Sequence, residues 1–263
     1  MKNFSFPTLQ SNTFSGFFVG QKLLTLPRVD STNTYLKQQL AKVEPVPEGT
    51  VIMAEEQYAG RGQADNVWIA DPGKNLTCSI LLNPSFVSPD KQFIINKAIS
   101  TGINDALYKI IGTDLKIKWP NDIYVKNKKI GGVLIENIIS GTAIKHAIVG
   151  IGINVNQTDF SPNLKNVTSL LQILHKNYSV SQLLKEVCIA IENRYLQLKS
   201  GKMELIDEAY LGNLYGFDEE LLFTVAGNKV RGTIVGVTER GLLEVSINGE
   251  RRSFANKEIT FII

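Results

Sequence analysis

Alternation of apolar and polar residues predicts several β-strands in the first part of the chain. Over Leu76–Leu82 the apolar residues, Cys78 among them, alternate with Thr77 and Ser79, which is the two-residue period of a strand. The same pattern predicts strands at Gln21–Pro27, Val51–Glu55, Leu115–Val125, Lys129–Ile138 and Ala143–Asn156, the last three as an antiparallel meander. The first twenty residues show no period, so we expect an irregular lead-in there.

Helical spacing of apolar residues predicts the helices. From Asp90 to Ile111 the apolar positions recur every three or four residues and stop at Gly112, which indicates a long helix packed on the core. Further helices are expected at Asn163–Lys176 and Ser181–Lys199. Cys188 lies on the apolar stripe of the last helix, and Cys78 on the apolar face of its strand, so both thiols are expected in the core.

The pattern changes near Gly216, where short strands follow one another closely. They are expected at Leu221–Ala226, Lys229–Val237, Leu242–Ile247, Arg251–Phe254 and Ile259–Ile262, separated by turn dipeptides. This spacing predicts a small barrel over residues 215–263, packed against a larger domain over residues 1–214. The fold class expected for the whole chain is therefore α+β.

Composition narrows the function classes. The chain has 263 residues, 43% hydrophobic and 20% charged, with a net charge of +3 that is too small to argue for nucleic-acid binding. Its two cysteines lack the spacing of a metal site or a disulfide framework, which suits a reducing compartment. No signal peptide and no apolar run of about 20 residues is visible, so we expect a cytoplasmic protein without a membrane partner.

The stretch Lys118–Glu136 carries the densest candidate chemistry. Pro120 removes a donor from the strand ladder, so an interruption is expected just before Asn121 and Asp122. Asp122 supplies a carboxylate, the ligand type that Mg²⁺ prefers. After a polar hairpin turn, Lys129 could reach an anion, and Gly132 leaves room for a ligand or another backbone.

Three other segments carry weaker signals. Ser31 or Asp30 is expected to cap a helix, and this strand-to-helix turn either caps alone or also holds a small polar ligand. Gly60 and Gly62 flank Arg61 in a loop that is either a plain turn or a wrap around a phosphate. The glycines before Asn154 leave one strand face bare, either for a ring or sugar or for a closely packed helix.

Four motifs in order resemble those of biotin protein ligases. They are Asp30-Ser-Thr-Asn, Gly60-Arg-Gly with Trp68, Lys118-Trp-Pro-Asn-Asp with Lys129-Ile-Gly-Gly and Glu136, and Gly150-Ile-Gly-Ile-Asn. The resemblance spans residues 28–156 and is of the monofunctional type, without an N-terminal DNA-binding domain. It implies a catalytic domain related to class II aminoacyl-tRNA synthetases and an SH3-like C-terminal barrel.

The resemblance also implies the reaction. ATP and biotin would form biotinyl-5′-adenylate, with Mg²⁺, and the acyl group would pass to one lysine of a biotin carboxyl carrier protein, in acetyl-CoA carboxylase or another biotin-dependent carboxylase. Joining a carboxylate to the α-phosphate of ATP gathers negative charge, so cations must face that charge. Lys118, Lys129, Arg61 and a magnesium ion near Asp122 are the candidates.

Residue roles follow from the same resemblance. The biotin-binding residues would be Ser31, Thr32, Asn33, Gln57, Gly60, Lys129 and Gly132. The nucleotide-binding residues would be Arg61, Trp68, Lys118, Asn121 and Asn154, with Trp68 stacked on adenine. Asp122 would orient or deprotonate the incoming lysine.

One loop departs from the family pattern. The family usually continues Gly-Arg-Gly-Arg-x-Gly-Arg-x-Trp, whereas Gln63-Ala64-Asp65-Asn66 fills this interval here. Two arginines and a glycine are missing, so we expect weaker retention of the anionic adenylate.

Other functions stay open at this stage. Lipoate ligases and octanoyltransferases share the fold, but the latter use a catalytic cysteine. A non-catalytic sensor of biotin or its adenylate would not release pyrophosphate from ATP. Nucleic-acid binding by the barrel would appear as salt-dependent binding to DNA, and Arg251-Arg252 is better explained as a solvated edge. The oligomeric state is not readable, and a homodimer stays open.

Overall fold

The computed structural model describes residues 8–11, 18–63, 66–112, 114–162, 164 and 166–262. Part of the expected irregular lead-in is a strand, β1, and residues 1–7 and 12–17 lie outside the described residues. Ala64 and Asp65 of the divergent loop lie outside them too.

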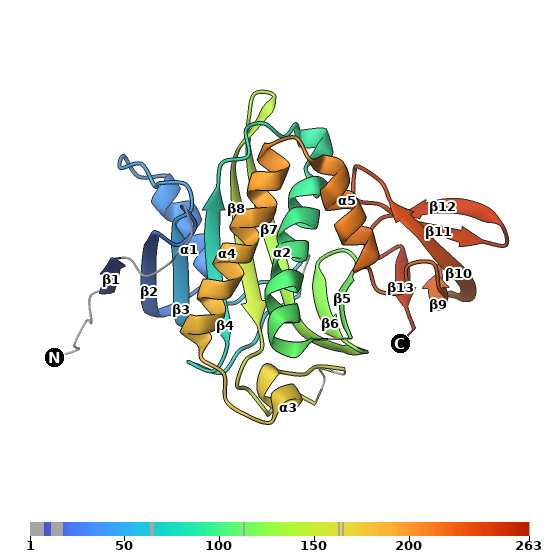
Figure 1. The fold of residues 1–263 in the computed structure, drawn as a ribbon, viewed down its shortest axis with the longest axis horizontal. Helices are drawn as coiled ribbons and strands as arrows, with labels where there is room; N and C mark the ends of the chain where they lie inside the picture. Colours follow the sequence, from blue (N-terminus) through green and yellow to red (C-terminus); the bar gives the residue numbers. More distant parts are fainter. Residues whose placement is uncertain are drawn as a thin grey trace.

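An eight-stranded mixed sheet forms the body of the protein (Figure 1). Its strands run in the order β1-β2-β3-β4-β8-β7-β6-β5, with β2 and β3 parallel and the other neighbours antiparallel. Their bounds are β1 Thr8–Ser11, β2 Lys22–Val29, β3 Val51–Gln57, β4 Leu76–Leu82, β5 Leu115–Lys118, β6 Asp122–Val125, β7 Lys128–Ser140 and β8 Ala143–Ile153.

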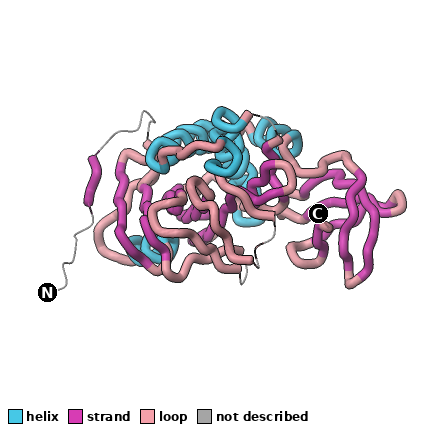
Figure 2. Tube along the Cα trace, turned by 90° about the horizontal axis from the view of Figure 1, so that it is seen from below, coloured by secondary structure: helices cyan, strands magenta, loops and turns pink. Residues whose placement is uncertain are grey.

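Helices lie on both faces of this sheet, and most of them lie on one face, as the view from below in Figure 2 shows. The long helices α2 and α4 pack on each other over one face, where the main core lies. The opposite face holds α1, against a smaller core that includes Leu36, Ile52 and Leu81. The helices are α1 Thr32–Leu40, the 3₁₀ turn Pro89–Lys91, α2 Phe93–Ile111, α3 Leu170–Leu174, α4 Val180–Lys199 and α5 Met203–Gly212.

The strand period assigns side chains to these two faces. On β4, Ile80 and Leu82 belong to the main core, whereas Leu81 between them belongs to the core under α1. Both expected core thiols are buried, and desolvation raises the pKa of Cys78 to about 12. Neither cysteine is therefore a reactive thiolate at neutral pH.

A second, five-stranded antiparallel sheet follows α5, at the right of Figure 1. Its order is β12-β11-β10-β9-β13, with β9 Glu220–Val225, β10 Asn228–Val237, β11 Leu243–Ile247, β12 Glu250–Phe254 and β13 Ile259–Phe261. Several polar contacts hold it to the rest, among them the ion pair of Lys91 Nζ with Glu239 Oε1 at 3.0 Å. Trp119 Nε1 donates to the Gly241 carbonyl at 2.9 Å, and the buried Lys97 Nζ lies 2.7 Å from Asp207 and 3.4 Å from the Val237 carbonyl.

The single strand expected over Leu115–Val125 was wrong, although its interruption at Pro120 was correct. Two strands, β5 and β6, form a hairpin whose turn contains the cis peptide Trp119–Pro120. Because Pro120 lacks an N–H, the ladder cannot continue through it, and the chain reverses there. The reversal pairs Lys118 with Asp122, so both candidate site residues lie at one end of the hairpin.

The helix expected over Asn163–Lys176 was also wrong in extent, since only α3 is helical among its described residues. The segment before α3 forms backbone hydrogen bonds with β7 instead. Lys129 N donates to the Asn166 carbonyl at 2.7 Å, and Thr168 N donates to the Lys129 carbonyl at 2.9 Å. Helix α5 had no counterpart among the expected elements. No helix in the described part of the chain is long and apolar enough to cross a membrane.

The α2–α4 contact depends on Gly102, which gives a stability prediction. A Cβ at Gly102 would lie 2.9 Å from the Ile191 Cα and 3.1 Å from the Ala190 carbonyl oxygen. Gly102→Ala should therefore lower the free energy of unfolding by about 1–3 kcal/mol, as overpacked cores do.

The matched control is Gly212→Ala at the end of α5, where a Cβ would meet no atom within 4 Å. This change should be neutral or stabilise by up to about 1 kcal/mol through helix propensity. Urea denaturation of both variants measures the difference, and equal midpoints would contradict the close α2–α4 contact.

Candidate active site

A cavity of about 290 Å³ opens on the α1 side of the large sheet and reaches the C-terminal sheet. Its walls bring together residues from α1, β3, β4, the hairpin β5–β6, β7, β8 and the loop before Trp68. The sequence-predicted residues among them are Ser31, Thr32, Asn33, Gln57, Arg61, Trp68, Lys118, Asn121, Asp122, Lys129 and Gly132. Candidate residues that lie far apart in the sequence thus share one pocket.

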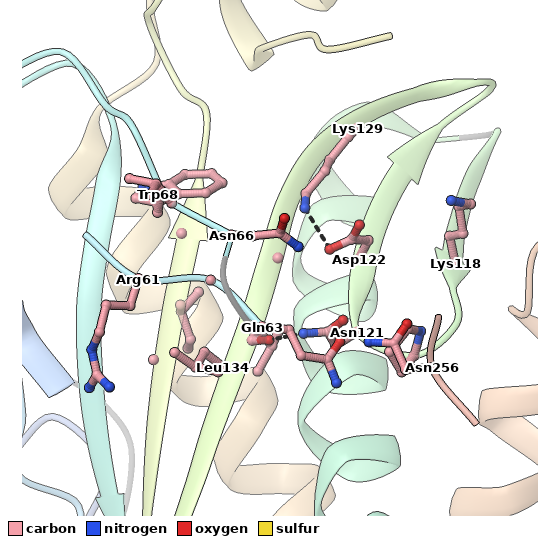
Figure 3. A pocket seen from close by; sticks show the side chains of 18 of the residues that line it. Arg61, Gln63, Asn66, Trp68, Lys118, Asn121, Asp122, Lys129, Leu134 and Asn256 are labelled. Carbon is pink, nitrogen blue, oxygen red and sulfur yellow. Dashed lines mark hydrogen bonds and ion pairs between the residues drawn. The ribbon is translucent and has the colours of Figure 1, made fainter. Parts of the chain in front are cut away.

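An ion pair lies at the centre of this pocket (Figure 3). Lys129 Nζ is 2.7 Å from Asp122 Oδ1, and the two side chains are 32% and 25% exposed. A Cβ on Gly132 would come within 3.0 Å of Asp122 Oδ1 and 3.4 Å of Lys129 Nζ. Glycine at this position therefore leaves the ion pair open to a ligand.

Lys118 faces the pocket from the other strand of the hairpin, where it pairs in register with Asp122. Its Nζ lies 5.2 Å from the centroid of the Tyr124 ring and 4.7 Å from that of Phe261. Burial lowers the pKa of the Lys118 ammonium; the nearby Asp122 charge opposes this shift, and the Lys129 charge adds to it.

The start of α1 forms a polar end of the pocket. Thr32 donates its backbone N–H at 2.7 Å and its hydroxyl at 3.0 Å to Gln57 Oε1. Ser31 is the N-cap residue, but its side chain makes no capping hydrogen bond. Capping alone therefore does not account for this turn.

Ser79 organises this end, and the sequence analysis did not assign it a role. Its Oγ lies 2.7 Å from Thr32 Oγ1 and 2.6 Å from Asn33 Oδ1, and the residue is fully buried. The signal available in the sequence was a hydroxyl in the middle of a strand of mostly apolar residues, because buried hydroxyls need partners.

Arg61 lies in the pocket wall but does not point at the ion pair (Figure 3). Its guanidinium contacts Glu136 at 2.7 Å, and the same carboxylate accepts a hydrogen bond from Asn33 Nδ2 at 2.7 Å. Glu136 thus joins the loop to the polar end. In this arrangement the guanidinium is paired with a carboxylate, and its expected contact with a phosphate stays a prediction.

The bare strand face of β8 is filled by the chain's own side chains. A Cβ at Gly152 would overlap the Trp68 ring, and one at Gly150 would lie 2.5 Å from Asn33 Oδ1. The closely packed helix is therefore present over Gly150, since Asn33 belongs to the first turn of α1, whereas the ring over Gly152 is the chain's own Trp68. The Trp68 Nε1 is buried without a hydrogen-bond partner in the described structure.

Two predicted site residues lie outside the pocket wall. Asn154 is 3% exposed and donates through Nδ2 to the Thr168 carbonyl at 3.0 Å, and its expected place beside the nucleotide stays a prediction. Gly60 lines a second hollow, which shares Arg61 and Gly62 with the main pocket. Its missing Cβ makes room for the Trp68 carbonyl, which a side chain at this position would overlap.

The C-terminal sheet completes the pocket. Asn256, Lys257, Ile259, Thr260 and Phe261 all line it. They belong to β13 and the turn before it, a segment with no motif of its own.

Comparison with known proteins identifies relatives of this arrangement. Residues 25–154 match the family described as the biotin/lipoate A/B protein ligase family. The bifunctional ligase/repressor BirA of Bacillus subtilis is 29% identical over 208 residues, which are 77% of this chain and 63% of that protein. The biotin–[acetyl-CoA-carboxylase] ligase of Paracoccus denitrificans is 33% identical over 136 residues, 49% of this chain and 53% of that one. The chain thus spans less than two thirds of the length of these two curated relatives.

Solved structures match over nearly the whole fold. The biotin protein ligase of Aquifex aeolicus in complex with biotin and ATP superposes with a TM-score of 0.75 at 27% identity, covering 91% of this chain and 98% of that one. A mutant of the same ligase in complex with biotin gives a TM-score of 0.74 at 28% identity, covering 91% of this chain and 97% of that one. Sequence motifs, fold and pocket agree in their similarity to the biotin/lipoate A/B protein ligase family.

Proposed function

We propose that this protein joins biotin to ATP as biotinyl-5′-adenylate and transfers the biotinyl group to a lysine of a biotin carboxyl carrier protein. The observation that carries the proposal is the Lys129–Asp122 ion pair above Gly132, set between a polar end and a tryptophan ring in one pocket. The structural match to a ligase that binds biotin and ATP supports it.

In the first step a carboxylate oxygen of biotin attacks the α-phosphorus of ATP. The new O–P bond forms as the bond to the β-phosphate oxygen breaks, and pyrophosphate leaves. Lys129 is the cation nearest the centre of the pocket, so it stabilises the charge that gathers on carboxylate and phosphate. Lys118, which lies on β5 opposite Asp122, adds a second cation.

The polar end of the pocket would bind biotin, and the part lined by Trp68 would bind adenine. The ureido head of biotin suits the polar residues Ser31, Thr32, Asn33 and Gln57. Ser79 holds the side chains of Thr32 and Asn33 in place. Trp68 offers a ring face to adenine from the loop. Asn121 anchors the hairpin turn, because its Nδ2 donates to the Val133 carbonyl. Arg61 would reach the nucleotide only after leaving Glu136.

In the second step the amine of the carrier lysine attacks the acyl carbon. The C–N bond forms, the C–O bond to phosphate breaks, and AMP leaves. The amine must be neutral to attack, and Asp122, on the floor of the pocket, is the carboxylate that accepts or orients its proton.

Magnesium fits this site only together with ATP. No group of three or more His, Cys, Asp or Glu residues that could hold a metal occurs in the described part of the chain. Mg²⁺ commonly uses one or two carboxylates and several phosphate oxygens. Asp122 with the phosphates of ATP would hold it, and it would neutralise phosphate charge.

We further propose that residues 1–214 form the catalytic domain and residues 215–263 an SH3-like domain. The two sheets support this division, since the second begins at Glu220. The proposal also includes a cytoplasmic location and a carrier from a biotin-dependent carboxylase, with a homodimer left open.

The test is a transfer assay with the purified protein, ATP, Mg²⁺, labelled biotin and a biotin carrier domain. Label on the carrier, together with release of pyrophosphate, would support the ligase. Tight biotin binding without pyrophosphate release would support a sensor instead. Transfer of lipoate or octanoate in place of biotin would assign the chain to the neighbouring activity in its family.

The divergent loop gives a prediction about the intermediate. Gln63 lines the pocket at the place where the family usually has an arginine. Gln63→Arg adds a cation facing the adenylate and should slow its dissociation up to about fivefold, the effect of one exposed ion pair. Release of labelled biotinyl-adenylate from the enzyme measures this rate.

The matched control is Gln38→Arg, which adds the same charge at an exposed position of α1 away from the pocket. Its release rate should equal that of the wild type. An unchanged rate in the Gln63→Arg protein would show that the missing arginine does not limit retention.

A further inference from the structure

We propose that Phe261, on the last strand of the C-terminal sheet, is a positioning residue that holds the Lys118 ammonium toward the phosphates of ATP. This inference rests on the proposed function. It assigns a specific task to a part of the chain that the sequence motifs do not reach.

Lys118 is held by ring faces. Its Nζ lies 4.7 Å from the centroid of Phe261 and 5.2 Å from that of Tyr124, both within the range of a cation–π contact. Among the described residues, Lys118 takes part in no ion pair within 4 Å. Asp122, which pairs with Lys118 in the strand register, lies 2.7 Å from Lys129 instead.

The choice of partner matters for catalysis. A carboxylate partner would neutralise Lys118 and occupy its N–H groups, so an incoming phosphate would have to displace it. Ring faces stabilise the cation without occupying those donors. Lys118 and Lys129 also repel each other, and the two rings offset part of this cost while leaving both charges available.

Two other aromatic rings hold Phe261 in place. Its ring packs edge-on against Phe223 at 5.2 Å and Tyr215 at 6.3 Å between centroids. Tyr215 in turn lies 6.0 Å from Tyr124 and donates its hydroxyl to Asn127 at 2.8 Å. These rings join the core of the C-terminal sheet to the hairpin that carries Lys118 and Asp122, so the position of the sheet sets the position of the cation.

In Figure 3, Lys118 lies across the pocket from Trp68, and the Lys129–Asp122 pair lies between them. If Trp68 receives the adenine, the phosphates extend from it toward Lys129 and Lys118. Lys118 therefore affects the affinity for ATP more than the affinity for biotin.

The test compares Phe261→Leu with Phe261→Tyr. Leucine keeps an apolar side chain but removes the ring face, so the KM for ATP in biotin-dependent pyrophosphate exchange should rise about three- to tenfold, the size of one cation–π contact, while the KM for biotin stays unchanged. Tyrosine keeps the ring and should retain most of the ATP affinity. Phe254→Leu, the same change on β12 of this sheet and outside the pocket wall, is the matched control and should match the wild type.

A readout independent of activity separates this inference from the proposed function. The pKa of Lys118, followed by NMR of ¹³C-labelled lysine and assigned with Lys118→Gln, should fall in Phe261→Leu because the cation loses a stabilising ring in a pocket that stays apolar. If the wild type shows no biotin-dependent exchange but this shift appears, the function is wrong and the ring contact stands. An unchanged pKa and an unchanged KM for ATP in both Phe261→Leu and a second variant, Tyr124→Leu, would overturn the inference.

Discussion

Replacing Lys129 by Met is expected to lower biotin-dependent pyrophosphate exchange by about 10²–10³-fold, the usual loss when one charge-stabilising donor is removed from a reaction centre. Methionine keeps most of the apolar stem and removes only the ammonium. Asp122, which the ammonium contacts at 2.7 Å, would then face the incoming carboxylate and phosphates without a cation between them. Exchange of labelled pyrophosphate into ATP measures the effect on the first step alone.

The matched control is Lys126→Met, in the turn of the β6–β7 hairpin, whose second strand carries Lys129. Lys126 is a lysine with a side chain 75% exposed, 3.9 Å from Asp114 and outside the pocket wall, so its loss should leave exchange unchanged. Equal exchange in the Lys129→Met protein and the wild type would remove the observation on which the proposed function depends. A similar loss in both variants would point to the stability of the hairpin instead.

The sequence predicted the elements of this site better than their arrangement. Strand period placed Cys78 in the core, and helical spacing predicted α2 to within a turn. Pro120 marked the interruption, but sequence could not reveal that the chain reverses there. The outcome depends on which strands β6 pairs with, and these are β5 and β7.

Long-range contacts account for most of what was missed. Glu136 was part of a motif, yet nothing in the sequence links it to Arg61, which lies 75 positions away along the chain. Phe261 carries no signal beyond that of an ordinary strand residue, because its role depends on how the second sheet docks on the first. Asn154 shows the opposite case. Its motif is visible in the sequence, but the hydrogen bond from its amide to the Thr168 carbonyl is not.

Replacing Asp122 by Asn is expected to separate the two chemical steps. Asparagine keeps the shape of the side chain and one oxygen that can still contact Mg²⁺, and it removes the charge, while Lys129 remains to meet carboxylate and phosphate. Adenylate formation should therefore survive within about tenfold, whereas transfer from preformed biotinyl-adenylate to the carrier should fall by about 10²–10⁴-fold, the range for loss of a general base. Single-turnover transfer and pyrophosphate exchange, measured on the same protein, give the two rates.

The pH dependence shows whether Asp122 acts as a base. A carrier lysine with an ordinary pKa of about 10.4 has only about one neutral amine in a thousand near pH 7.4. If Asp122 removes its proton, raising the pH supplies neutral amine directly, and the deficit of Asp122→Asn should shrink about tenfold for each pH unit until the amine titrates. A deficit that is constant between about pH 7 and 9.5 would mean that Asp122 orients the amine without taking its proton. Asp114→Asn, at a half-exposed carboxylate beside Lys126, is the control for a general loss of negative charge, and it should transfer biotin at the wild-type rate.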